Sequence, residues 1–367
     1  MSKAADLASL ASASETALSN RNIVINGGFT ISQRNGTTLT STLNNKYFLD
    51  RWLFYLNGSC AVSTQQMGST DSNTTGLNTA SGEVYNNVMS VDCTTAASLG
   101  STDLAGFLQL IEGYNSVPIA GQSATLSFWV KTNITGQYYV TFKLGSARSY
   151  VAPYTVSSAN TWEKKTITLT MDSLTNLNAQ STTNGTGFQI YWGLRLGTSS
   201  QQTSTINSWH DGNFYGTSSQ VTWGTSTSDS FYIGGVQFEK GDTATPFEHR
   251  SFGQELALCH RYYWNTYNGA AIGSNTGTTN AIGRSAGGQS YETISEGNFP
   301  TTMRAVPTMQ IYNPVTGTAG SIRGDASNFA TCQINFRGVN YYSFNMAGVA
   351  IGQSTFVSGH VTADAEL

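Results

Sequence analysis

Four carboxylates lie in turn-rich stretches where loop oxygens can gather around a cation. Asp50 opens the run Asp50-Arg51-Trp52, and Glu239, Asp242 and Glu248 share a second stretch. Calcium accepts about six to eight such carboxylate and carbonyl oxygens, so these four residues are the candidate ligands of a calcium ion. The favoured alternative is local: Asp50 pairs with an arginine or caps a turn, and the other three are solvated. On that interpretation the chain has no cofactor.

Histidine chemistry has little support. The sequence contains no G-x-S-x-G, phosphate-loop or H-E-x-x-H motif. His210 and Asp211 follow Trp209 and could form an acid–base pair, but neighbours on a strand point to opposite faces. A glycosidase needs two carboxylates across a cleft, and the sequence places no such pair. We therefore expect no catalytic residues and a protein that is not an enzyme.

Aromatic residues in loop-like positions suggest a different chemistry. Trp209 and Tyr215, with Phe214 and Trp223 nearby, could stack on sugar rings. Aromatic side chains more often belong to a core, and alternation around Trp223 favours a buried strand position. Trp209 and Tyr215 are the candidate sugar-binding residues.

The elements that must position these side chains are strands. The run Phe188, Ile190, Trp192, Leu194 and Leu196 alternates with Gln189, Tyr191, Gly193 and Arg195, and residues 125–130 and 139–144 follow the same period of two. Such alternation buries one face of each strand and leaves the other wet, as in antiparallel sandwiches. The sequence predicts a mainly β chain: a jelly-roll-type antiparallel β-sandwich, a second, smaller β domain and a short N-terminal helix.

The composition of the chain argues against several classes of protein. Charged residues make up 11% of the chain, and 18 basic against 21 acidic residues give a net charge of −3, which argues against nucleic-acid binding. No apolar run is long enough to cross a membrane, and the N-terminus lacks the apolar region of a secretory signal peptide. The cysteines are too dispersed for a zinc site.

Changes in composition along the chain divide it into four parts. Residues 1–20 are rich in Ala and Ser and carry a helical apolar stripe, which suggests an oligomerisation or attachment segment; a frayed terminus is the alternative. Residues 21–250 form the sandwich. Ser251 and Gln254 have capping-box spacing, so residues 251–264 form a connecting helix, or hinge, before a β domain at 265–367.

Several blocks resemble tailed-bacteriophage fibre-type virion proteins. The most specific is Gly234-Gly-Val-Gln-Phe-Glu-Lys-Gly-Asp-Thr-Ala-Thr-Pro-Phe-Glu-His-Arg250, followed by Gln254-Glu-Leu-Ala-Leu-Cys-His-Arg-Tyr-Tyr263. It is similar to the junction between a carbohydrate-binding-module-like sandwich and a C-terminal domain in those proteins. Shorter blocks with the same resemblance are residues 2–8, 22–34, 50–52, 303–308 and 362–367.

The resemblance implies a tail or fibre-like virion role, a homotrimer, and assembly in the host cytoplasm. It implies contacts with other virion proteins through the N-terminal segment and with host-surface glycans, and it carries over no catalytic residues. Two alternatives remain: a glycan-degrading tail depolymerase, and a structural decoration or connector protein without receptor contact.

Overall fold

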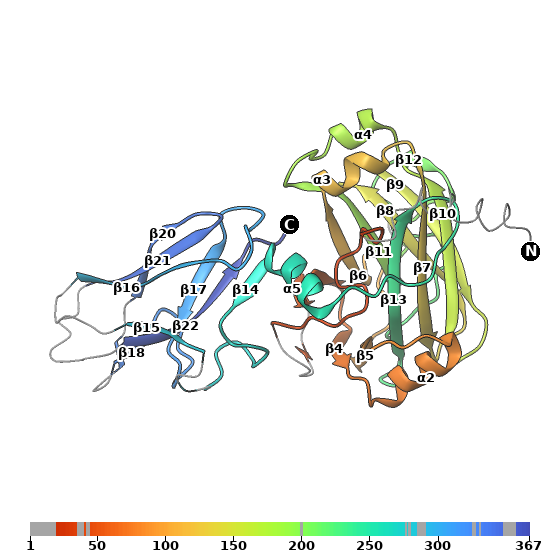
Figure 1. Cartoon of the computed structure of the whole chain (residues 1–367). Helices are drawn as coiled ribbons and strands as arrows, with labels where there is room; N and C mark the ends of the chain where they lie inside the picture. Colours follow the sequence, from red (N-terminus) through yellow and green to blue (C-terminus); the bar gives the residue numbers. More distant parts are fainter. Residues whose placement is uncertain are drawn as a thin grey trace, which may run out of the picture. The chain divides into compact units, whose positions relative to one another are not determined.

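The chain folds into two compact units, which we call the sandwich unit and the C-terminal unit (Figure 1). The sandwich unit comprises the chain up to Phe29, Ser41–Lys46 and Leu53–Arg250, and the C-terminal unit comprises Thr30–Thr40, Tyr47–Trp52 and Ser251–Leu367. The computed structural model describes residues 20–34, 40–41, 45–198, 201–275, 277, 280–284, 291–324, 328–329, 332–347 and 357–367. The helix expected over residues 1–20 lies outside these residues except for Asn20.

Two antiparallel sheets make up the sandwich unit. One runs β4-β5-β13-β7-β10 and the other β12-β9-β8-β11-β6-β3. Two short strands, β1 (Thr40–Ser41) and β2 (Lys46–Leu49), lie in sequence where the chain passes from one unit to the other. The remaining bounds are β3 Trp52–Asn57, β4 Ala61–Met67, β5 Val88–Thr95, β6 Leu104–Glu112, β7 Ser123–Thr132, β8 Gly136–Leu144, β9 Arg148–Val156, β10 Glu163–Thr170, β11 Thr186–Leu196, β12 Trp209–Asp211 and β13 Ser230–Lys240.

The space between the two sheets is filled by large aromatic side chains from both. The Trp192 ring on β11 stacks on Phe107 of β6 at 5.5 Å between centroids, and it meets Phe128 of β7, in the opposite sheet, edge-on at 6.0 Å. All three side chains are fully buried. The predicted inner faces of these strands are therefore confirmed, and so is the mainly β class with an antiparallel sandwich.

The outer face of β8 and β11 differs from the prediction of a wet surface. Tyr139, Thr141 and Lys143 on β8 and Tyr191 on β11 are no more than 1% exposed. The reason is a covering segment that follows β12: the Thr141 hydroxyl donates to the Tyr215 carbonyl at 3.1 Å. Alternation alone cannot foresee a loop that folds back over the polar side of a sheet.

A second correction concerns the end of β11. The pairing of β11 with β6 shifts between Gly193 and Arg195, as at a β-bulge, and a bulge reverses the faces that follow it. Arg195 therefore turns inward, where it is fully buried and pairs with Asp103 at 2.8 Å. Leu196, expected on the inner face, instead packs with Leu104 and Leu108 in a separate apolar cluster.

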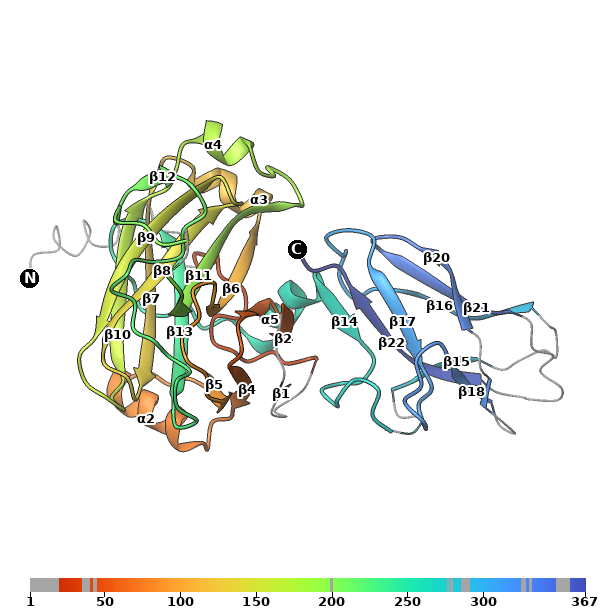
Figure 2. The ribbon, with the colours of Figure 1, turned by 180° about the vertical axis from the view of Figure 1, so that it is seen from behind.

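Short helices close the ends of the sandwich. Figures 1 and 2 show α3 (Gly113–Ser116) and α4 (Leu174–Asn178) at one end and α2 (Ser72–Ser81) at the other, and a 3₁₀ turn, η1 (Val117–Ile119), follows α3. The side chain of Asp71 caps α2 by accepting from the Asn73 amide at 2.7 Å.

The C-terminal unit is the predicted second, smaller β unit, and it is built around one central strand. β22 pairs with β14, β15, β17 and β18, and β16-β21-β20 form a separate three-stranded sheet. Its core contains Phe344, Val361 and Ile311. The bounds are β14 Tyr263–Asn265, β15 Ile282–Arg284, β16 Tyr291–Asn298, β17 Thr308–Tyr312, β18 Ile322–Gly324, β19 Asn328–Phe329, β20 Cys332–Arg337, β21 Tyr341–Ala347 and β22 Val357–Asp364.

The expected connecting helix exists as α5 (Phe252–His260) and starts with the predicted capping box. The Gln254 amide donates to the Ser251 hydroxyl at 3.4 Å, and the Ser251 amide donates to the Gln254 side chain at 3.1 Å. Its buried residues are Glu255 and Cys259, while Phe252 is 64% exposed. By its contacts α5 belongs to the C-terminal unit.

The domain bounds differ from the expectation in two early segments. Residues 30–40 and 47–52 were expected in the sandwich, but they are part of the C-terminal unit. The reason is a set of buried charges: Arg51 pairs with Glu366, and the Arg51 guanidinium lies 3.6 Å from the centroid of the Tyr262 ring. A boundary drawn from composition cannot detect partners that are more than 300 positions apart.

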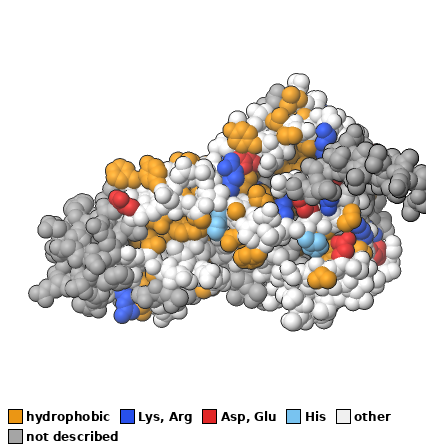
Figure 3. Space-filling view, viewed as in Figure 1, with side chains coloured by type: hydrophobic (Ala, Val, Ile, Leu, Met, Phe, Trp, Pro, Cys, Tyr) orange, Lys and Arg blue, Asp and Glu red, His pale blue; other side chains and the backbone are white. Residues whose placement is uncertain are grey.

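Charged side chains are sparse on the face drawn in Figure 3, where basic and acidic groups form small patches of both signs. This agrees with a charged fraction of 11%. Among the residues that the structure describes, no helix combines the length and apolar character needed to cross a membrane.

Candidate functional site

The candidate calcium ligands lie in two different units. Glu239 and Glu248 belong to the sandwich unit, and both accept hydrogen bonds from protein groups. Glu239 accepts from Thr245, from its backbone amide at 2.9 Å and from its hydroxyl at 2.7 Å. Glu248 accepts from the backbone amide of Asn22 at 2.8 Å. Asp242 is exposed and accepts from the Thr243 hydroxyl. In the described parts of the chain, no group of three or more His, Cys, Asp or Glu side chains is arranged to hold a metal ion.

Asp50 is buried in the C-terminal unit. It accepts from the Gln33 amide at 2.7 Å and from the Gln33 side chain, and Gln33 also donates to the Tyr263 carbonyl at 2.9 Å. Burial raises the pKa of Asp50, against the opposing effects of Arg34 and of the two bonds from Gln33. Asp50 is therefore held by Gln33, whereas the local alternative expected an arginine partner or a turn cap.

The His210–Asp211 pair and Trp209 lie on the edge strand β12. The His210 ring stacks on Phe214 at 4.9 Å, and the exposed Asp211 carboxylate pairs with Arg148 at 2.5 Å. Trp209 packs against Tyr150 at 5.6 Å and donates its indole N–H to the Thr170 carbonyl at 2.9 Å. Trp209 is therefore half-buried because it packs at the edge of the sheet. Its contacts do not include Tyr215.

Tyr215 has a different environment. It lies on the covering segment above the outer face of the sheet, with its ring edge-on to Tyr191 at 4.9 Å between centroids. Tyr55 on β3 is close enough to both hydroxyls to raise the pKa of Tyr191 and of Tyr215 after the larger effect of burial, which takes Tyr215 to about 12. We call Tyr55, Tyr191 and Tyr215 the tyrosine cluster.

The sheet beneath the tyrosine cluster is shaped to hold it. Tyr191 lies over Gly106 on the neighbouring strand β6, where a Cβ atom would sit 2.5 Å from the tyrosine oxygen. The partly buried Leu53 and Leu110 pack with Tyr55 and Tyr215 around it. Glycine at position 106 therefore leaves room for the hydroxyl end of Tyr191 and for the Trp192 carbonyl, which would lie 2.2 Å from that Cβ atom.

Lys143 on β8 adds a cation to the site. Its ammonium nitrogen lies 3.6 Å from the centroid of the Tyr215 ring and donates to the side-chain oxygen of Asn213. Burial lowers the pKa of Lys143 to about 7. The contacts of Lys143 with the Tyr215 ring and the Asn213 oxygen join the covering segment to β8, although burial disfavours the charged form of the lysine.

The tyrosine cluster has one unused hydrogen-bonding group. The Tyr191 side chain is 1% exposed, and its hydroxyl has no partner among the described residues. A buried hydroxyl without a partner costs about 1–3 kcal/mol, which a ligand hydroxyl or a water molecule can recover. Half-buried rings around such a group can pack on the apolar face of a sugar while the Tyr191 hydroxyl bonds its rim.

Sequence reasoning identified Tyr215 but missed Tyr55, Tyr191 and Lys143 as site residues. The signal was present on β8 and β11, where the supposedly wet face carries the bulky side chains Tyr139, Lys143 and Tyr191. Large amphipathic groups repeated on a polar face indicate that something covers or binds that face.

The lowered pKa of Lys143 predicts a stability that rises with pH. The folded chain releases the Lys143 proton near pH 7, whereas the unfolded chain keeps it until about pH 10.4, so the unfolded state binds more protons between these values. Unfolding free energy should rise above pH 7 by up to about 1.4 kcal/mol per pH unit from this group. Urea denaturation at pH 6, 7, 8 and 9 measures the slope, and Lys143→Met should remove this contribution. Parallel pH curves for the two proteins would contradict the assignment.

Comparisons of this chain with known sequences and structures find only weak similarity. No family model matches the sequence, and no curated protein matches it. Solved structures that resemble it include the enzymatically active domain of tailspike protein 4 of bacteriophage CBA120 (13% identity, TM-score 0.30, 60% of this chain and 22% of that one). A family 11 carbohydrate-binding module from Clostridium thermocellum, in complex with a mixed-linked tetrasaccharide, has 11% identity and a TM-score of 0.26 over 59% of this chain and 100% of that one. A cyclase from Fischerella sp. has 13% identity and a TM-score of 0.31 over 63% and 97%. Likeness at this level supports no inference about function.

Proposed function

We propose that this chain is a non-enzymatic, glycan-binding protein. The observation that carries the proposal is the tyrosine cluster, in which the half-buried rings of Tyr55 and Tyr215 surround the buried, unpartnered hydroxyl of Tyr191. Neutral sugars suit such a site because they offer an apolar ring face and a rim of hydroxyls, and need no opposite charge. The charge-poor composition of the chain supports the same ligand class. Neither a metal ion nor another cofactor is part of the proposal.

We further propose that the protein belongs to a phage virion, as a tail or fibre-like component that contacts host-surface glycans during adsorption. This part rests on the resemblance of blocks such as residues 234–250 and 254–263 to fibre-type virion proteins. The same resemblance supports a homotrimer that joins other tail proteins through its N-terminal segment, after assembly in the host cytoplasm. The mass of the purified chain in solution tests the trimer.

Two substitutions test the tyrosine cluster. Tyr215→Ala removes a ring and should weaken glycan binding roughly fivefold to tenfold, the value of one aromatic contact. Tyr191→Phe removes only the unpartnered hydroxyl, so it should weaken binding while leaving stability unchanged or raised. Binding is measured on an array of bacterial surface polysaccharides and then by calorimetric titration of the oligosaccharides that bind.

The matched control is Tyr114→Ala, which removes a tyrosine from α3 that is 57% exposed and outside the tyrosine cluster. It should leave binding unchanged. An affinity that neither Tyr215→Ala nor Tyr191→Phe changes would reject the tyrosine cluster as the site. Release of reducing ends from a bound polysaccharide would instead favour the depolymerase, and a chain that binds neither polysaccharides nor host cells would favour the connector protein.

A further inference from the structure

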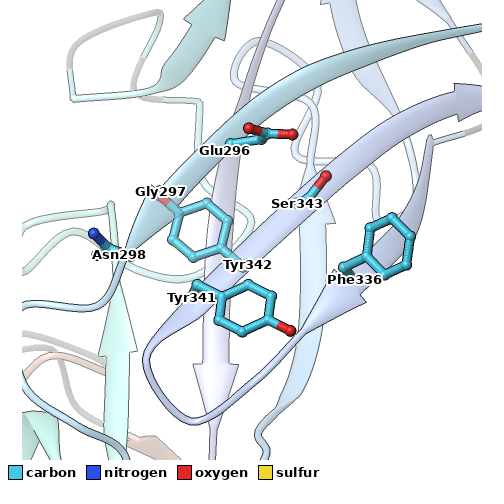
Figure 4. A pocket seen from close by; sticks show the side chains of 7 residues that line it. All are labelled: Glu296, Gly297, Asn298, Phe336, Tyr341, Tyr342 and Ser343. Atoms are coloured by element: carbon cyan, nitrogen blue, oxygen red, sulfur yellow. The ribbon is translucent and has the colours of Figure 1, made fainter.

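The C-terminal unit has a pocket that shares no residue with the tyrosine cluster of the sandwich unit. It has a volume of about 460 Å³, within the range of small-molecule sites, and it opens over the three-stranded sheet (Figure 4). Its lining residues are Glu296, Gly297 and Asn298 of β16, Phe336 of β20, and Tyr341, Tyr342 and Ser343 of β21.

Two strand irregularities aim side chains into this pocket. Along β20, Ile334 pairs with Phe344 of β21, but Phe336 pairs with Ser343. Two residue steps along β20 are therefore matched by one step along β21, which is a β-bulge. Without this bulge Phe336 would share the face of Ile334, which lies across from the core residue Phe344. The bulge turns Phe336 to the outer face, where its side chain is 61% exposed.

The other strand that pairs with β21, which is β16, also has a register shift. Along β16, Thr293 pairs with Asn345 and Ser295 with Phe344, so the register shifts next to the same core residue. As a result Glu296 faces Ser343 directly across the strands. Glu296, Ser343 and Phe336 therefore form one row across all three strands, on one face of the sheet.

The pocket combines aromatic rings with polar side chains. Figure 4 shows the rings of Phe336 and Tyr341 beside Ser343, whose hydroxyl lies on the side of Glu296. Tyr341 is 50% exposed. Single exposed aromatic residues are common, but two beside one pocket form an apolar wall that water solvates poorly.

The pocket also contains a buried group in need of a partner. Ser343 is 5% exposed, and its hydroxyl has no hydrogen-bond partner within the described part of the chain. Such groups are uncommon in folded proteins and mark places where a ligand or water bonds. Glu296 supplies carboxylate oxygens that accept from hydroxyls and repel anions.

We propose that this pocket binds one neutral pyranose residue of a glycan. The sugar ring packs on Tyr341 and Phe336, and its hydroxyls bond Ser343 and Glu296. Uronic acids and other anionic sugars are rejected by the carboxylate of Glu296, since like charges at short range disfavour binding. The inference adds a second site to the proposed function and uses none of the tyrosine cluster's residues.

Nuclear magnetic resonance of the full chain tests the proposal with three neutral probes, the methyl glycosides of glucose, galactose and mannose, and one anionic probe, methyl glucuronoside. At least one neutral probe should bind, and Tyr341→Ala should weaken it roughly fivefold to tenfold. Tyr341→Phe keeps the ring and should bind normally. Glu296→Gln should admit the glucuronoside that the natural chain excludes.

The outcomes separate this pocket from the tyrosine cluster. Tyr215→Ala should leave binding at the pocket unchanged, so failure at one site does not decide the other. The proposal is overturned if no neutral probe binds, if binding ignores Tyr341→Ala, or if the natural chain binds glucuronoside equally well. It is also overturned if Phe336→Ala lowers the mass of the assembled protein without affecting sugar binding, because the rings would then be a subunit contact.

Discussion

Replacing Glu366 by alanine is expected to destabilise the C-terminal unit by about 3–5 kcal/mol, the cost of leaving a buried charge without its partner. The carboxylate of Glu366 pairs with Arg51 and with Arg34, the latter at 3.3 Å, and the side chains of Glu366 and Arg51 are 4% and 1% exposed. Removing Glu366 takes a carboxylate partner away from the buried Arg51 guanidinium.

Asp364 provides a matched control two residues away. It pairs with Arg34 at 3.0 Å, but its side chain is 40% exposed, so Asp364→Ala should cost no more than about 1 kcal/mol. Amide hydrogen exchange followed by mass spectrometry reports each unit separately in the full chain. The opening free energy of β22 should fall in Glu366→Ala, while that of β11 in the sandwich unit should not. Equal effects of the two substitutions would contradict the burial argument.

The segments around this ion pair show how far the sequence could predict the structure. Gln33, Asp50, Tyr263 and Glu366 lie in separate blocks that carry the resemblance to fibre-type proteins. In the structure these blocks meet in the C-terminal unit, through bonds such as that from Gln33 to the Tyr263 carbonyl at 2.9 Å. The sequence offers an arginine partner as one alternative for Asp50, but the partners of these residues are set by long-range folding that no local pattern encodes.

Strand periodicity predicted the sandwich because each inner face repeats every two residues. It failed at the bulge on β11, where one extra residue reverses the pattern and Arg195 and Leu196 exchange faces. A similar bulge turns Phe336 outward on β20. Residues 334–336 include no glycine or proline that would indicate a bulge in the sequence. The pocket in the C-terminal unit depends on this bulge and its counterpart on β16, which explains why sequence reasoning did not find it.

Replacing Trp192 by alanine is expected to destabilise the sandwich unit by about 3–5 kcal/mol, since it removes a large side chain from a core that cannot collapse around the gap. Trp192 is fully buried, and its ring touches Phe107 in its own sheet and Phe128 in the facing one. The lost contacts therefore loosen both sheets at once.

Urea denaturation monitored by circular dichroism measures the change, with Val84→Ala as the control. Val84 is 73% exposed, so its truncation should alter stability by no more than about 0.5 kcal/mol. Trp192→Phe retains a ring between Phe107 and Phe128, so it should fall between the natural chain and Trp192→Ala. A Trp192→Ala protein that unfolds at the same urea concentration as the natural chain would mean that this ring does not join the two sheets. Because Tyr191 is adjacent on β11 and faces the opposite side, Trp192→Ala should also weaken the glycan binding that we propose for the tyrosine cluster, whereas Val84→Ala should not.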